Sequence, residues 1–277
     1  MDYFHELTQT VNRALDEDIR TGDVTASLID PEKKAHAKII TRQPAVVCGR
    51  PWVDEVLKQV DVTITPQWHI KDGDQVQAGA LLLELTGKAR SLLTAERTAL
   101  NFLQLLSGTA TRTNTYVQMI EGTGATLLDT RKTIPGLRLA QKYAVKTGGA
   151  ENHRMGLFDA FLIKENHIKA AGSITAAIGA ARRLQGDLRV EVEVESLEQL
   201  SEAIIASPDW IMLDNFTLGD MHKAVDMAST TIIKLEASGG IENSEELKKI
   251  ASTGVDYISI GALTKHHEAI DLSMRLR

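Results

Sequence analysis

Basic residues follow apolar segments at two places in the second half of the chain. Residues 125–129 are followed by Thr130, Arg131 and Lys132, and the apolar residues 160–163 are followed by Lys164. Arginine and lysine side chains bind carboxylates and phosphates, arginine through paired hydrogen bonds. A lysine that closes an apolar strand would be half buried unless it faced a pocket, and a buried lysine needs an anionic partner. The pattern therefore indicates a pocket for anionic substrates.

Acidic residues recur in the same kind of position. Glu191, Glu193 and Glu195 alternate along one segment, so all three share one face of the predicted strand. Asp214 ends the next apolar segment. Proteins usually hold Mg²⁺ with one or two carboxylates plus substrate phosphates. We therefore take Glu193 and Asp214 as a candidate magnesium site, whereas no Cys/His cluster has zinc spacing.

Small residues follow the last two predicted strands. The first of these loops contains Ser238, Gly239 and Gly240, and the second contains Ser259 and Gly261. Glycine lets backbone N–H groups approach an anion, and the start of a following helix favours negative charge. Loops after the last strands are the usual phosphate site of parallel α/β barrels. These loops are therefore candidate phosphate-binding loops.

Basic residues are frequent between Arg131 and Lys169, against a net charge of −6 for the whole chain. Lys142, Lys146 and Lys169 are expected on solvated helix faces. Arg131, Lys132, Arg154 and Lys164 are assigned to the site, and the residues alone leave His153 open between a structural and a site role. Any one such residue could be a structural ion pair, but the recurrence at six strand ends favours one shared pocket.

Strands and helices alternate after Gly124. We predict strands at 125–129, 160–164, 189–194, 210–214, 232–236 and 257–260, and helices at 174–184, 197–206, 221–228 and 244–252. Alternation of this kind implies parallel strands with right-handed crossovers. Six strands are fewer than the eight of a complete TIM barrel, so the barrel is either open or contains one strand more than the pattern reveals.

The first half of the chain has a different pattern. Short β segments within 62–85 precede a strong helical pattern at 91–106, which Gly108 is expected to end or bend. The predicted fold class is α/β: an N-terminal α+β sandwich domain at 1–108, then an open TIM-like α/β barrel at 109–265. A C-terminal helix at 266–277 is expected to pack back on the first domain.

Composition narrows the class of protein. The chain has 277 residues, 43% of them hydrophobic, which suffices for a sizeable core. Its net charge argues against nonspecific binding to nucleic acid or anionic membranes. The single Cys48, the acidic opening residues and the lack of a long apolar run predict a cytoplasmic protein.

Seven motifs resemble those of one family, in the same order and over nearly the whole chain. The motifs are DTRKTIPG at 129–136, GGAENHR at 148–154, LIKENH at 162–167, EVEV at 191–194, MLDN at 212–215, EASGGI at 236–241 and SIG at 259–261. They resemble quinolinate phosphoribosyltransferase, the carboxylating nicotinate-nucleotide pyrophosphorylase. The barrel of that family is open and has seven strands, one more than the six predicted from the pattern.

The resemblance implies transfer of phosphoribose from phosphoribosyl pyrophosphate to quinolinate, giving nicotinate mononucleotide, pyrophosphate and CO₂ in NAD synthesis. It implies a homodimer or higher homo-oligomer in which Arg97 reaches into a partner's pocket. The implied quinolinate-binding residues are Arg131, His153, Arg154 and Lys164. The implied site for the phosphoribosyl donor and Mg²⁺ consists of Thr130, Lys132, Glu193, Asp214, Ser238, Gly239, Gly240, Ser259 and Gly261. The implied catalytic residues are Lys132, Lys164, Glu193 and Asp214.

Three alternatives remain open. A related transferase could use another pyridine carboxylate, and an aldolase on a similar barrel could use Lys164 as a Schiff-base nucleophile. The turns around Asp72-Gly73 also resemble a lipoyl-type β sandwich, although a carrier module does not explain the second half of the chain.

Overall fold

The computed structural model describes residues 2–239 and 244–277 and divides the chain into two compact units. The first unit comprises Met1–Asn114, Thr133–Gly149 and Leu263–Arg277, and the second comprises Thr115–Lys132 and Ala150–Ala262. The sequence predicted one continuous catalytic domain at 109–265, whereas the second unit consists of two segments and lacks residues 133–149. The reason is helix α4 (Arg138–Thr147), whose Ala140 and Ala144 are buried in the hydrophobic core of the first unit.

An antiparallel sheet forms the framework of the first unit, in the order β12-β1-β5-β3. Its strands are β1 (Lys34–Thr41), β3 (Thr65–Trp68), β5 (Leu81–Lys88) and β12 (Leu272–Leu276). The expected C-terminal helix at 266–277 is wrong, because this segment forms β12 and pairs Ala37 with Leu276. Apolar residues alternate at Leu272, Met274 and Leu276, which is a strand period.

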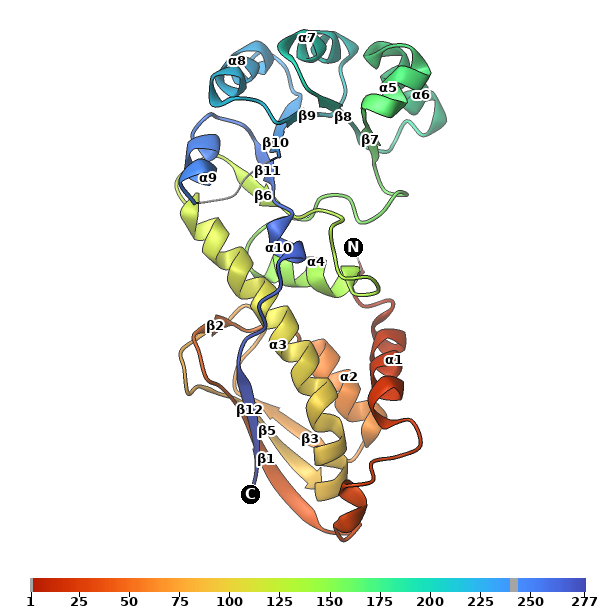
Figure 1. Ribbon diagram of the computed structural model, residues 1–277, viewed down its shortest axis with the longest axis vertical. Helices are drawn as coiled ribbons and strands as arrows, with labels where there is room; N and C mark the ends of the chain where they lie inside the picture. Colours follow the sequence, from red (N-terminus) through yellow and green to blue (C-terminus); the bar gives the residue numbers. More distant parts are fainter. Residues whose placement is uncertain (1, 240–243) are drawn as a thin grey trace. The chain divides into compact units, whose positions relative to one another are not determined.

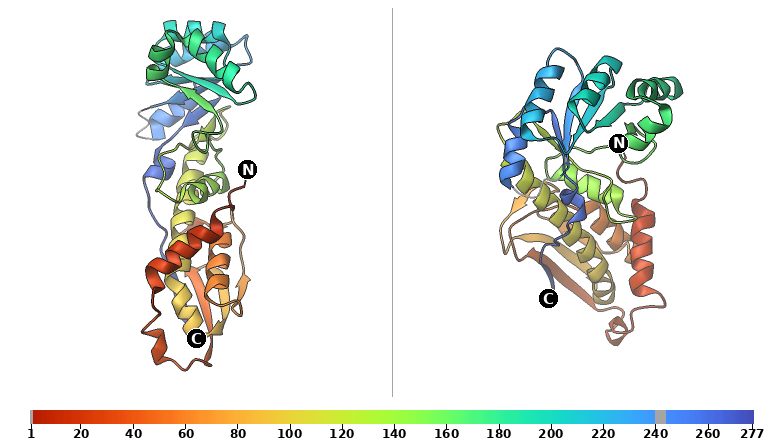
Figure 2. Two further views of the ribbon diagram at one scale, coloured as in Figure 1. Left: turned by 90° about the vertical axis from the view of Figure 1, so that its right-hand side faces the viewer. Right: turned by 45° about the horizontal axis from the view of Figure 1, so that its top comes forward.

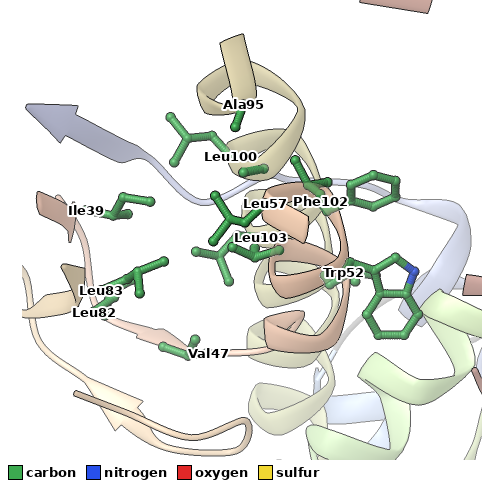
Figure 3. Packing of buried hydrophobic residues seen from close by; sticks show 14 of the residues in the cluster. Ile39, Val47, Trp52, Leu57, Leu82, Leu83, Ala95, Leu100, Phe102 and Leu103 are labelled. Carbon is green, nitrogen blue, oxygen red and sulfur yellow. The ribbon is translucent and has the colours of Figure 1, made fainter. Parts of the chain in front are cut away.

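Helices α1 (Leu7–Ile19), α2 (Arg50–Val60) and α3 (Ala89–Met119) accompany this sheet. Figure 3 shows Trp52 and Leu57 of α2 and Leu100 and Leu103 of α3 in the core that they share with Leu83 of β5. The short elements of the unit are η1 (Ala26–Leu28), β2 (Ala45–Val46), β4 (Gln75–Val76) and α10 (Ala262–Lys265), the last at the junction of the two units.

Helix α3 continues through Gly108, where the sequence predicted an end or a bend. The glycine has another purpose, because a Cβ at this position would lie 2.1 Å from the carbonyl oxygen of Glu268. Gly108 therefore lets the C-terminal segment cross α3 at close range. Lys142 also differs from its prediction as a solvated residue, because α4 buries this side chain completely.

The second unit contains a parallel six-stranded sheet in the order β6-β11-β10-β9-β8-β7. The strands are β6 (Thr126–Leu128), β7 (Phe161–Ile163), β8 (Val190–Val194), β9 (Trp210–Asp214), β10 (Lys234–Ser238) and β11 (Tyr257–Ser259). All six predicted strands are present, and β10 begins two residues late because Ile232 is almost fully exposed. A single parallel bridge between Leu128 and Glu151 stands at the free edge of β6.

Helices follow the strands of the second unit on the outer side of the curved sheet (Figures 1 and 2). They are α5 (Glu165–Ala171), α6 (Ile174–Leu184), α7 (Leu197–Ala206), α8 (Leu218–Ala228) and α9 (Ser244–Ala251). Ser173, Ser196 and Thr217 cap the starts of α6, α7 and α8, each accepting a backbone N–H with its side-chain oxygen. Within the described residues, no helix is long and apolar enough to cross a membrane.

Candidate functional site

The C-terminal ends of neighbouring strands bring four of the predicted site residues to one edge of the parallel sheet. Glu193 lies on β8, Asp214 ends β9 and Ser238 ends β10, and β11 contributes Ser259. The register pairs Asp214 with Ser238, so these two residues stand at the same level. Active sites of parallel α/β barrels lie at this edge of the sheet.

Lys164 and Glu193 form an ion pair across two adjacent strands. Lys164 directly follows β7 and is the N-cap residue of α5, and its side chain is 45% exposed. Glu193 is only 12% exposed, so the lysine reaches over a carboxylate that lies deeper in the site. This ion pair keeps the ammonium group of Lys164 in a fixed position at the site.

Three carboxylates gather at the ends of β8 and β9. Oxygen atoms of Glu193, Glu195 and Asp214 lie within 4.8 Å of one another. Asp214 Oδ2 also accepts a hydrogen bond of 2.9 Å from the side-chain amide of Asn215. Glu195 was not predicted as a site residue, although its spacing of two from Glu193 was a usable signal. Such oxygen ligands suit Mg²⁺.

Arg131 and Arg154 are close enough to influence each other. Burial, and then the charge of Arg131, lower the pKa of Arg154, whereas Glu191 and Asp159 raise it. Among the described residues, the buried Nε atom of Arg131 has no hydrogen-bond partner. Two guanidinium groups that repel each other make a site that an anion would stabilise.

His153 is buried beside two buried glutamates. Its Nε2 atom lies 2.9 Å from Glu191 Oε2 and 3.3 Å from Glu236 Oε2. Burial lowers the pKa of His153 and the two glutamates raise it, whereas the hydrogen bond that Nδ1 accepts from the backbone N–H of Arg154 requires that nitrogen to be unprotonated. Burial raises the pKa of Glu236. The sequence indicated Glu191 as a polar strand residue and placed Glu236 in the EASGGI motif, but neither was given a role in the site.

The glycines of the two candidate loops lie close to neighbouring side chains. A Cβ at Gly261 would lie 3.1 Å from the side chain of Lys132, and Thr130 Oγ1 accepts the backbone N–H of Lys132 at 3.1 Å. Gly239 has a φ of +105°, and a Cβ there would lie 2.3 Å from Asn215 Oδ1. Lys132 is exposed and Thr130 is partly exposed. Gly240 lies outside the described residues.

Arg97 belongs to the first unit, on α3, and is exposed. The other described site residues of the prediction all belong to the second unit. Cys48 is buried as a free thiol in the first unit.

Comparisons with known proteins agree over both units. Residues 23–107 match the model of the quinolinate phosphoribosyl transferase N-terminal domain, and residues 109–275 match that of the C-terminal domain. A probable nicotinate-nucleotide pyrophosphorylase (carboxylating) of Bacillus subtilis is 42% identical, covering 97% of this chain and 93% of the relative. The solved structure of the nicotinate-nucleotide pyrophosphorylase of Francisella tularensis has 50% identity and a TM-score of 0.95, covering 98% of this chain and 96% of that one.

Proposed function

Because the chain belongs to the quinolinate phosphoribosyl transferase family, we propose that it joins quinolinate to the ribose of phosphoribosyl pyrophosphate. The products are nicotinate mononucleotide, pyrophosphate and CO₂, and the reaction serves NAD synthesis. The observation that carries the proposal is the pair Arg131 and Arg154 in the same compact unit as the Glu193–Asp214 acid cluster. One substrate is a dicarboxylate, and the other needs both cations and a metal site.

Quinolinate binds in this proposal between Arg131, Arg154 and Lys164. Each guanidinium can hold a carboxylate through two hydrogen bonds. Lys164 adds a third positive charge, steadied by Glu193. His153 belongs to the same subsite, directly before Arg154 in the chain.

The phosphoribosyl donor binds beside Lys132 and the loops after β10 and β11. Lys132 lies against Gly261, where a larger residue would crowd it. Thr130, Ser238 and Ser259 offer hydroxyl groups, and Gly239 lets the backbone approach the 5-phosphate. Gly240, which follows Gly239 in the sequence, also belongs to the proposed phosphate-binding residues.

The acid cluster fits a magnesium ion. Glu193 and Asp214, with Glu195 beside them, would hold it through carboxylate oxygens. The ion would offset the negative charge that grows on the departing pyrophosphate.

The residues act mainly by position and charge. The bond from ribose C1 to the pyrophosphate oxygen breaks, and the oxygen keeps the electron pair while Lys132 offsets its charge. Glu193 and Asp214 favour the cationic character of the sugar, and the pyridine nitrogen attacks C1 with its lone pair. The ring, now cationic, loses its 2-carboxylate as CO₂. The electron pair left at C2 takes up a proton, and no covalent enzyme intermediate forms.

A direct assay tests this proposal. The purified chain is mixed with quinolinate, phosphoribosyl pyrophosphate and Mg²⁺, and CO₂ release is followed. Parallel reactions with nicotinate test the related transferase, and borohydride trapping with a carbonyl substrate tests the aldolase. Turnover of nicotinate without turnover of quinolinate would contradict the proposal.

The proposal also covers the assembly of the chain and its place in the cell. The chain acts as a homodimer or higher homo-oligomer, with Arg97 entering the pocket of a partner subunit. It works in the cytoplasm, where the thiol of Cys48 stays reduced.

A further inference from the structure

A buried cluster lies on the inward face of the second sheet, below the acids of the proposed site. Glu191 precedes Glu193 by two residues on β8 and so shares its face, nearer the start of the strand. Glu236 lies on β10, and both glutamates are completely buried. His153 stands between them and is 6% exposed.

Aromatic side chains lie beside this cluster, near the opposite edge of the sheet. Trp210 begins β9 and Tyr257 begins β11, and their rings stack at 4.1 Å. The guanidinium of Arg189 lies 4.0 Å above Trp210 and 3.8 Å from Glu191 Oε2. Because both glutamates are completely buried, neither offers an oxygen to a substrate at the strand ends.

Both ring nitrogens of His153 lie close to other groups of the protein. Nε2 faces the two glutamates, and Nδ1 accepts the backbone N–H of Arg154 at 2.8 Å. The backbone N–H of His153 is donated to Asp129 Oδ1 at 2.9 Å, and Asp129 Oδ2 accepts the side chain of Asn152 at 2.7 Å. The ring thus connects β8 and β10 to the turn that carries Arg154.

The residues that follow Arg154 are also fixed by hydrogen bonds. Asp159 accepts the backbone N–H groups of Met155 and Gly156 at 2.8 and 3.0 Å. Asp129, which accepts hydrogen bonds from His153 and Asn152, directly follows β6 and precedes Arg131 by two residues. Arg154 is consequently presented from a turn whose position depends on His153 and on the buried acids behind it.

We infer that His153 is a positioning residue for Arg154. Glu191 and Glu236 fix the ring of His153 on its buried side, and His153 in turn fixes Arg154 where it can bind the dicarboxylate substrate. The inference rests on the proposed function and changes one of its details, because His153 then acts through Arg154 instead of contacting quinolinate. Glu191 and Glu236 become part of the binding machinery although neither reaches the substrate.

Two substitutions of His153 separate its two links. In His153→Asn the side-chain oxygen can take the place of Nδ1 and accept from Arg154, but the side chain is too short to reach the glutamates. In His153→Gln the amide nitrogen can take the place of Nε2 and donate to the glutamates. A third variant, Glu191→Leu, keeps the volume and removes the acceptor, and Glu55→Leu is its matched control. Glu55 is a buried acid of the first unit that contacts Lys58 and Gln59.

Quinolinate affinity is measured by calorimetry, the KM for phosphoribosyl pyrophosphate by assay, and folding by thermal unfolding. We expect His153→Asn and Glu191→Leu each to weaken quinolinate binding about tenfold, because each removes the close contact between His153 and Glu191. The double variant should bind no more weakly than either single variant, since both break the same link. His153→Gln should stay near wild type, and Glu55→Leu should leave quinolinate affinity unchanged.

Other outcomes overturn the inference. Equal losses in both His153 variants with normal binding in Glu191→Leu would show that the ring contacts the substrate itself. Additive losses, or an equal rise in the KM for phosphoribosyl pyrophosphate, would also contradict a positioning role. A wild-type protein that fails to convert quinolinate would instead refute the proposed function. The crystal structure of His153→Asn would then decide the inference, by whether Arg154 is displaced or stays in place.

Discussion

Arg131 and Arg154 concentrate positive charge at one place, and the protein has to compensate for it. Their mutual repulsion lowers the pKa of Arg154, after burial itself. Glu191 and Asp159 work in the opposite direction. A dianionic substrate would relieve the same repulsion, which is a physical reason for the site to prefer a dicarboxylate over a monocarboxylate.

Replacing Arg131 by alanine should reduce kcat/KM for quinolinate by about a hundredfold or more, because a bidentate charged contact is lost. Arg131→Lys should recover only part of this loss, since lysine cannot form the paired hydrogen bonds. Steady-state kinetics and thermal unfolding measure both effects. Arg183→Ala is the control, at an exposed arginine in the last turn of α6. Near-normal activity in Arg131→Ala would remove this residue from the site.

Asp214→Asn should raise the Mg²⁺ concentration needed for half-maximal rate by about tenfold, because a neutral amide is a weaker ligand for the ion. The measurement is the initial rate as a function of Mg²⁺ at saturating substrates. Asp187→Asn, at an exposed aspartate before β8, should leave the curve unchanged. An unchanged curve in Asp214→Asn would separate Asp214 from the metal site.

At the scale of elements, the two faces of strand β8 serve different purposes. Val190, Val192 and Val194 are completely buried. Glu191 and Glu193 occupy the other face, the first inside the cluster with His153 and the second in the site. Alternation of side chains along a strand makes both assignments possible within five residues.

Gly108→Ala tests the crossing of α3 by the C-terminal segment. Alanine in a helix would normally stabilise it, by up to about 1 kcal/mol. Here the new Cβ would meet the carbonyl oxygen of Glu268 at 2.1 Å, so the segment must shift. We expect the free energy of unfolding to fall by about 1–3 kcal/mol, the usual cost of overpacking. Urea unfolding measures it, with Gly124→Ala, where nothing lies near the added Cβ, as the control.

A stability equal to or above that of the wild type in Gly108→Ala would mean that the segment at Glu268 gives way easily. The close approach would then not be what requires glycine in α3.

At the scale of the whole molecule, the proposed exchange of Arg97 makes each site depend on two chains. Arg97 and Lys164 belong to different compact units. Closed dimers with twofold symmetry place the same residue at two equivalent sites. The proposal therefore predicts complementation between two inactive variants.

Arg97→Ala and Lys164→Ala should each be nearly inactive. After equal amounts are unfolded together and refolded, half of the dimers contain one chain of each kind, and each such dimer has one intact site. Activity should therefore return to about a quarter of the wild-type value. The assay is CO₂ release, and separately refolded variants serve as controls. No recovery in the mixture would contradict the donation of Arg97 across an interface.

Much of the second unit could be predicted from local patterns. Alternating strands and helices gave all six strands, and the residues at their ends gave Lys164, Glu193 and Asp214, which the structure brings together. Periodicity and strand-end position are properties of short segments, so they can be seen in a sequence. The candidate phosphate-binding loops rest on glycine and serine clusters, which are also local signals, and their role stays a prediction.

Local patterns failed where distant segments meet. Residues 133–149 and the C-terminal strand β12 join the first unit through contacts with residues far away in the chain. The burial of Lys142 and the cluster of His153, Glu191 and Glu236 likewise depend on which elements pack together.

The sequence by itself determined which residues could bind anions and at which strand ends they stand, because side-chain chemistry and strand period are encoded residue by residue. Only the tertiary structure decided that His153 turns inward to two buried acids. That choice arises from the register of β8 against its neighbours and from burial, and both depend on the whole fold.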